Sequence, residues 1–164
     1  MPVSLAPDCP APSLPERSAA VRRCTGRFCL QLGWAPVHEV PLPNGRRADI
    51  LALMPDGALA CIEIKSGERD FLTDGKWQEY REFCDQLFFA VDLDFPQNLL
   101  PEDTGLIVAA PPVADLLRPA PLHRLAPARR RLMLQRIAWL ATSRLAAHED
   151  PAGAATVRAL LRAE

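Results

Sequence analysis

The chain has 164 residues, of which 49% are apolar and 24% charged, proportions typical of one soluble globular domain. No apolar run approaches the roughly 18 to 20 residues of a membrane-spanning helix, and the N-terminus lacks the basic start and apolar block of a signal peptide. The five cysteines include no Cys-x-x-Cys pair, which argues against a zinc cluster or a disulfide framework. We therefore expect a cytoplasmic protein with reduced thiols and no membrane association.

The net charge of −1 hides a segregation of charge along the chain. Residues 63–103 hold eleven acids and four bases, residues 17–47 six arginines and one acid, and residues 116–147 seven arginines and no acid. This pattern suits a cation site beside surfaces that bind a polyanion, or arginines on solvated helix faces. Of the 19 basic residues only Lys65 and Lys76 are lysines, which indicates positions that need a compact ammonium group, or chance.

The first predicted elements are a tail and a helix. Residues 1–12 contain four prolines and are expected to form a flexible tail, so that residues 13–164 make up a single domain. Ser13 and Glu16 match a capping box, which predicts a helix that begins there and ends near Gly33.

Two three-residue segments with the same turn-forming residue types follow, Pro43-Asn44-Gly45 and Pro55-Asp56-Gly57. Proline suits the first position of a turn, Asn or Asp the second, and glycine the left-handed third, as in three-residue hairpin loops. We therefore predict a meander of three antiparallel strands over residues 37–42, 46–54 and 58–65.

The second half of the chain is predicted to alternate helices with buried strands. A helix follows the acidic stretch after Lys65, and Pro111 to Pro127 is expected to be an irregular connector because it holds five prolines. Asp150-Pro151 is typical of a helix start. The order predicts an α/β fold whose helices cover a mixed sheet of about five strands, with strands over 87–91 and 106–110 and helices over 128–147 and from 150 onward.

The hairpin loops also predict which residues face each other. Counting back from Pro55-Asp56-Gly57 places Asp49 opposite Glu63, with a wholly apolar set on the other face of the hairpin. The same count from Pro43-Asn44-Gly45 places Glu39 opposite Asp49. Three carboxylates would then line up across three adjacent strands.

A carboxylate pair at about 5 Å repels by roughly 3 kcal/mol at an effective dielectric near 20, so a compensating charge is expected. Hard oxygen ligands without a nearby histidine favour Mg²⁺ or Mn²⁺, bound by Asp49 and Glu63 with Glu39 as a further candidate. Two alternatives remain: Arg47 and Lys65 neutralise the pair as a surface network, or Glu39 is simply solvated.

Lys65 lies on the same face as Glu63, where its ammonium would hold an attacking water or stabilise charge on a phosphate. An Asp followed by Glu-x-Lys on the next strand is the arrangement of the PD-(D/E)XK nuclease superfamily. Here it consists of Asp49, Glu63 and Lys65 on a predicted hairpin, after one helix and before another.

The match extends further along the chain. The runs LPNGRRADILAL, EIKS and DFLTDGKWQEYREFCDQLFFAVD resemble the MmcB family of bacterial DNA repair proteins, over residues 17–147. The resemblance implies a restriction-endonuclease-like three-layer α/β/α fold and a role in DNA damage repair. DNA and other proteins of the DNA damage response are then the expected partners.

The predicted site therefore combines a catalytic set, a metal set and a DNA-binding set. Asp49, Glu63 and Lys65 are the expected catalytic residues, and the Ile64 carbonyl would join the two carboxylates on the metal. The DNA-binding candidates are Arg47, Lys76, Gln78, Arg129, Arg130 and Arg131. The alternative is a structural role for Lys76 and a solvated helix face for the three consecutive arginines.

Two functions from different classes fit these residues. The first is a metal-dependent phosphodiesterase that hydrolyses DNA backbone bonds. The second is a non-catalytic DNA-binding or adaptor protein that keeps the nuclease fold. The Asp, Glu and Lys of the motif favour the first.

Overall fold

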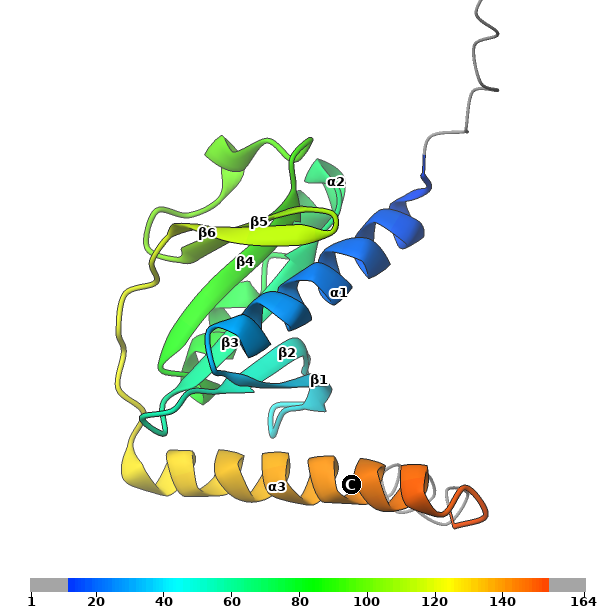
Figure 1. Cartoon of the computed structure of the whole chain (residues 1–164). Coiled ribbons are helices and arrows are strands. Elements are labelled where there is room, and N and C mark those ends of the chain that lie inside the picture. Colours follow the sequence, from blue (N-terminus) through cyan, green and yellow to red (C-terminus); the bar gives the residue numbers. More distant parts are fainter. Residues whose placement is uncertain (1–11, 154–164) are drawn as a thin grey trace, which may run out of the picture.

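The computed structural model describes residues 12–153. Its strands are β1 (Ala35–Pro41), β2 (Arg47–Leu53), β3 (Leu59–Lys65), β4 (Gln86–Asp92), β5 (Gly105–Ala110) and β6 (Val113–Arg118). They form one six-stranded sheet in sequence order (Figure 1). The sheet is mixed: β1, β2 and β3 are antiparallel, β3, β4 and β5 are parallel, and β6 is antiparallel to β5.

Helices cover both faces of the sheet, which gives the expected three-layer α/β/α arrangement (Figure 1). The long helix α1 crosses one face, while α3 and the 3₁₀ helix η1 pack against the other. The short elements α2 and η2 follow β3 and β4. The bounds are α1 (Leu14–Gln31), α2 (Glu68–Thr73), η1 (Trp77–Phe83), η2 (Gln97–Leu99) and α3 (Pro127–Glu149).

The hydrophobic core has two parts, because successive side chains of β2 and β3 point to opposite faces of the sheet. Ile50 and Ile62 face α1, where they pack with Val21. Leu51 and Cys61 point to the opposite face and pack with Met133 of α3. This is the alternation that the hairpin register predicts, and it places Asp49 and Glu63 on the face away from α1.

Several sequence predictions are confirmed in detail. The Ser13 N–H donates to Glu16 Oε2 at 2.8 Å, so the capping box opens α1. The two hairpin loops close with glycines in the left-handed region, at φ 79° for Gly45 and 83° for Gly57. Four of the five cysteines lie in the described residues, and all four are free and buried.

Three predictions need correction or fall outside the structure. The sheet has six strands rather than about five, because β6 forms inside the proline-rich connector and pairs with β5. The helix expected after the acidic stretch is split into α2 and the 3₁₀ helix η1. The N-terminal tail (except Pro12) and most of the helix predicted from Asp150 lie outside the described residues.

No helix within residues 12–153 combines the length and apolarity that crossing a membrane requires.

Candidate functional site

The two hairpin loops set the position of the site's carboxylates. β2 pairs with β3 through Ile50↔Ile62 and Leu51↔Cys61, which is the predicted register. β1 pairs with β2 through His38↔Ile50, also as predicted. Short loops whose glycines adopt a positive φ allow little slippage, so two local turn sequences align residues from three strands.

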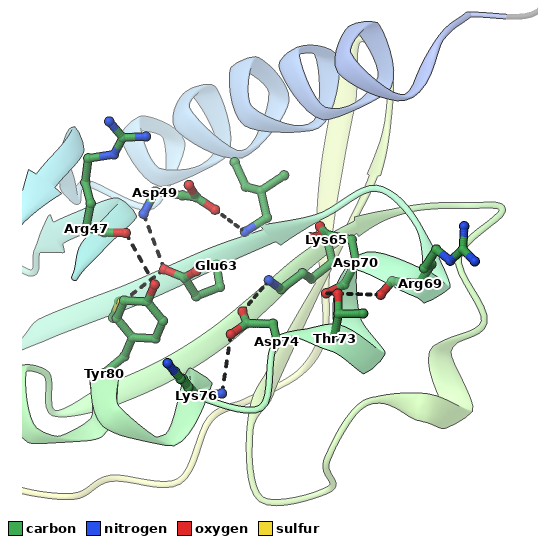
Figure 2. A network of polar contacts seen from close by, with 12 residues as sticks. Arg47, Asp49, Glu63, Lys65, Arg69, Asp70, Thr73, Asp74, Lys76 and Tyr80 are labelled. Carbon is green, nitrogen blue, oxygen red and sulfur yellow. Dashed lines mark hydrogen bonds and ion pairs between the residues drawn. The ribbon is translucent and has the colours of Figure 1, made fainter.

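The backbone ladder between β2 and β3 ends at Ile50↔Ile62, and side chains take over the hydrogen bonds beyond it. The Asp49 N–H donates to Glu63 Oε1 at 3.3 Å, and the Ile64 N–H donates to Asp49 Oδ2 at 2.8 Å. Figure 2 shows the two carboxylates side by side at this point. Each carboxylate is therefore held by a backbone group of the other strand.

The electrostatics of this pair are unfavourable for two ionised groups. Glu63 is 3% exposed, and burial together with the Asp49 charge raises the pKa of Glu63 to about 8. Burial also raises the pKa of Asp49, against the hydrogen bond from the Ile64 N–H. Within residues 12–153 no arginine, lysine or histidine forms an ion pair with either carboxylate. The pair therefore combines burial with mutual repulsion that the Lys65 charge offsets only in part.

Lys65 lies on the same strand as Glu63 but contacts a third carboxylate. Its Nζ is 2.6 Å from Asp74 Oδ2, and the lysine residue is 5% exposed. Asp74 follows α2 directly as its C-cap residue, and its other oxygen accepts from the Lys76 N–H at 3.4 Å. The sequence analysis does not identify this contact (Figure 2). The proximity of Asp74 to a lysine in the acidic segment is the only sequence signal for it.

Glu39 lies opposite Asp49, as the loop count predicts, but the ladder skips this position. Its backbone has φ 52°, and its carboxylate is ion-paired with Arg22 and, at 2.6 Å, with Arg47 Nε. Arg47 and Lys65 thus form their ion pairs with Glu39 and Asp74 rather than with the central pair, although the Lys65 charge lowers the pKa of both Asp49 and Glu63. Metal binding by Glu39 stays a prediction, and it would require the carboxylate to leave these arginines.

The oxygen-rich pair fits a hard divalent cation, although it is a small ligand set. Within residues 12–153 no group of three or more His, Cys, Asp or Glu side chains is arranged to hold a metal ion. In the same part of the chain Asp49 and Glu63 supply two carboxylates without an ion-pair partner. The backbone carbonyl of Ile64 is the predicted third protein ligand. The remaining positions of a magnesium ion are ordinarily filled by water and substrate phosphate.

Tyr80 of η1 borders the carboxylate pair. Its hydroxyl donates to the Arg47 carbonyl oxygen at 3.4 Å, and the side chain is largely buried. Burial and the nearby Glu63 charge raise the pKa of Tyr80 well above its usual range. The phenol therefore stays neutral. Lys76 and Gln78, predicted to bind DNA, are both exposed at the start of η1 and so are accessible to a ligand.

The three arginines that begin α3 have unequal surroundings. Arg130 binds Asp85 through both terminal nitrogens, at 2.6 and 2.9 Å, and also donates to the Gly57 carbonyl oxygen. Arg129 pairs with Glu82 at 3.0 Å, whereas Arg131 is exposed. Gly57 belongs to the loop at the far end of β3 from Lys65. Contact of these arginines with DNA stays a prediction, and Arg130 in addition has a structural role that the sequence did not reveal.

The comparisons with known proteins agree with this architecture. A family model described as DNA repair protein MmcB-like matches residues 7–152. No curated protein matches the chain. Among solved structures, the SPO1766 protein of unknown function from Silicibacter pomeroyi is 42% identical to it, with a TM-score of 0.79 over 84% of this chain and 94% of that one. The predicted family resemblance is thus confirmed, and the chain belongs to the MmcB-like family of DNA repair proteins.

Proposed function

We propose that this protein is a cytoplasmic, metal-dependent phosphodiesterase that hydrolyses DNA backbone bonds during repair. The observation that supports this most strongly is the pair of Asp49, which is partly buried, and Glu63, which is buried; neither has an ion-pair partner within residues 12–153, and Lys65 lies two residues after Glu63 on the same strand. Folding does not favour such a pair by itself. Its unfavourable charge is expected at a functional site.

Each residue has a definable part in this chemistry. Asp49 and Glu63 would hold Mg²⁺ or Mn²⁺, aided by the Ile64 carbonyl. When bound, such an ion makes a coordinated water more acidic and stabilises charge on the leaving oxygen. The Lys65 ammonium would orient the attacking water or stabilise charge that develops on the phosphate. Asp74, at 2.6 Å, fixes the position of that ammonium and is a positioning residue.

A second function is supported by the same residues. Within residues 12–153 no third His, Cys, Asp or Glu side chain completes a metal-binding group with Asp49 and Glu63. The Lys65 ammonium already contacts Asp74. A nuclease fold with this reduced set also suits a DNA-binding or adaptor protein of the repair machinery. The two functions differ in whether DNA is cleaved, not in whether it is bound.

The test is a cleavage assay of the purified chain on single-stranded, duplex, flapped and nicked DNA with Mg²⁺ or Mn²⁺. The phosphodiesterase predicts products that depend on the metal and disappear with EDTA. Binding to these DNAs without cleavage of any of them would instead establish the adaptor function.

A further inference from the structure

A groove of about 730 Å³ lies between α1 and the edge strand β1. Its helical side carries Arg22, Arg23 and Arg27, and its strand side includes His38. Arg23 and Arg27 are four positions apart and share one helix face, and Arg22 is adjacent to Arg23, beside the stripe that packs on the sheet. We call this feature the arginine groove.

Gly26 brings the two walls of the arginine groove together. A Cβ atom at this position would lie 3.2 Å from both Cε1 and Nε2 of His38. The glycine therefore lets the imidazole lie directly against the α1 backbone, at the cost of a less favourable residue within a helix. Burial and the nearby Arg22 lower the pKa of His38, so the positive charge of the groove comes from its arginines.

Two of these arginines have no neutralising partner in the described part of the chain. Arg23 and Arg27 are exposed, and neither forms an ion pair with an acidic side chain within residues 12–153. They are four positions apart on α1, where guanidinium groups are neighbours and repel. By contrast, an acidic oxygen lies within 3.0 Å of each of Arg17, Arg46, Arg81, Arg129 and Arg130.

Arg22 connects one end of the arginine groove to the surroundings of Asp49. Arg22 lines it and is ion-paired with Glu39, which lies opposite Asp49 in the β1–β2 register. Both charges are close enough to influence Asp49, since Glu39 raises its pKa and Arg22 lowers it. The Arg22–Glu39 ion pair thus connects the groove to a neighbour of Asp49.

We propose that the arginine groove binds the phosphates of the DNA strand that reaches Asp49 and Glu63. This inference rests on the proposed function, because it supplies the substrate path for that site. None of the described residues that line the groove is a Phe, Tyr or Trp, so these residues offer no stacking platforms of the kind that single-strand binders use. Arginines without aromatic residues are suited to the backbone of a duplex, which they hold without reading its sequence.

The experiment measures binding of a fluorescein-labelled DNA duplex by the full chain in EDTA, across a series of salt concentrations. Arg23→Ala and Arg27→Ala are made singly and together. Both positions are exposed and alanine favours helix, so the fold is expected to persist, which circular dichroism checks. The matched control is Arg124→Ala, which removes an exposed arginine that lies outside the groove, near η1 and the start of α3.

Each groove variant should weaken binding about fivefold near physiological salt and reduce the slope of log K against log salt by ~0.9. The double variant should reduce the slope by ~1.8, and the control should leave it unchanged. A double variant that binds with wild-type affinity and slope overturns the proposal, as does an equal effect of the control. So does a wild-type chain that binds single-stranded RNA or an acidic protein but no duplex DNA.

This readout is separate from catalysis because EDTA prevents metal-dependent cleavage. If the wild type cleaves DNA but the groove variants bind normally, the arginine groove is wrong and the phosphodiesterase stands. If the groove variants lose binding but no metal supports cleavage, the groove stands and the proposed catalysis is wrong.

Discussion

The Lys65 ammonium lies 2.6 Å from a carboxylate oxygen of Asp74 and is almost fully buried. The lysine of the Glu-x-Lys sequence is therefore held by a residue from the end of the next helix, beside the carboxylate pair (Figure 2). A close carboxylate holds a buried ammonium in one position. A fixed position is what a group that stabilises a phosphate transition state needs.

Replacing Lys65 by arginine tests whether the site needs the compact shape of the ammonium group in addition to a positive charge. A planar guanidinium cannot occupy the place of the compact ammonium against Asp74, so DNA cleavage should fall on the order of 10²-fold. DNA affinity should change little, because one phosphate contact among several contributes a small share. Lys76→Arg, at the exposed second lysine, is the matched control and should retain activity. Full activity of the Lys65 variant would remove Lys65 from the mechanism.

Metal binding should depend on Glu63. Calorimetric titration of Mn²⁺ into the wild type should give heat, and a metal concentration 100-fold above Kd should add about 2.7 kcal/mol to the free energy of unfolding. Glu63→Gln keeps an oxygen for the Asp49 N–H but removes the charge, so it should show neither effect. Glu68→Gln at an exposed position of α2 should behave as wild type. Equal binding by the wild type and Glu63→Gln would place the metal elsewhere.

Without metal, Glu63 should make the protein less stable as the pH rises. The unfolded chain loses this proton near pH 4.3, about the usual glutamate pKa, whereas the folded protein keeps it up to about pH 8. Between these values the folded state binds more protons, so the free energy of unfolding falls with increasing pH. In EDTA, Glu63→Gln should remove much of this fall, and its advantage over wild type near pH 8 should be on the order of a few kcal/mol.

Urea unfolding of both proteins in EDTA, at about pH 5 and about pH 8, measures this difference. Glu68→Gln again serves as the control for loss of a carboxylate at the surface. Parallel pH profiles for the wild type and Glu63→Gln would show that Glu63 titrates as an ordinary carboxyl group.

The arginines that begin α3 should differ in their effect on stability. Asp85 is 1% exposed and accepts the Leu59 and Leu125 N–H groups in addition to two bonds from Arg130. Arg130→Ala would leave this buried carboxylate without its cation and should cost about 3 kcal/mol. Arg131→Ala at an exposed site should cost less than about 0.5 kcal/mol. Thermal unfolding of the two variants compares them directly, and equal midpoints would contradict the assigned role of Arg130.

The parts of the site that the sequence predicts are those set by local turn chemistry. Gly45 and Gly57 close short loops at positive φ, and a fixed loop length determines which residues of the flanking strands face each other. Asp49 and Glu63 could therefore be aligned by counting residues. The same argument needs no knowledge of how the helices pack.

The parts that the sequence does not predict depend on contacts between distant or irregular segments. Asp74 reaches Lys65 because the chain reverses after the short α2, where no periodicity guides a prediction. Arg130 and Asp85 are 45 residues apart and meet only when α3 packs on the sheet. The prolines around β6 indicated an irregular connector. Pro111 and Pro112 instead form the hairpin loop between β5 and β6.

The central claim, that the carboxylate pair cleaves DNA, is tested most directly by comparing initial cleavage rates of the wild type and Glu63→Gln. Both proteins are purified in the same way and assayed with Mn²⁺ on the DNA that the wild type cleaves fastest, with DNA affinity measured in parallel. We expect the rate to fall on the order of 10³-fold while the affinity is retained, because the loss of one metal ligand disables the chemistry and not the binding. Equal rates for the two proteins, or no cleavage of any DNA by the wild type, would contradict the claim.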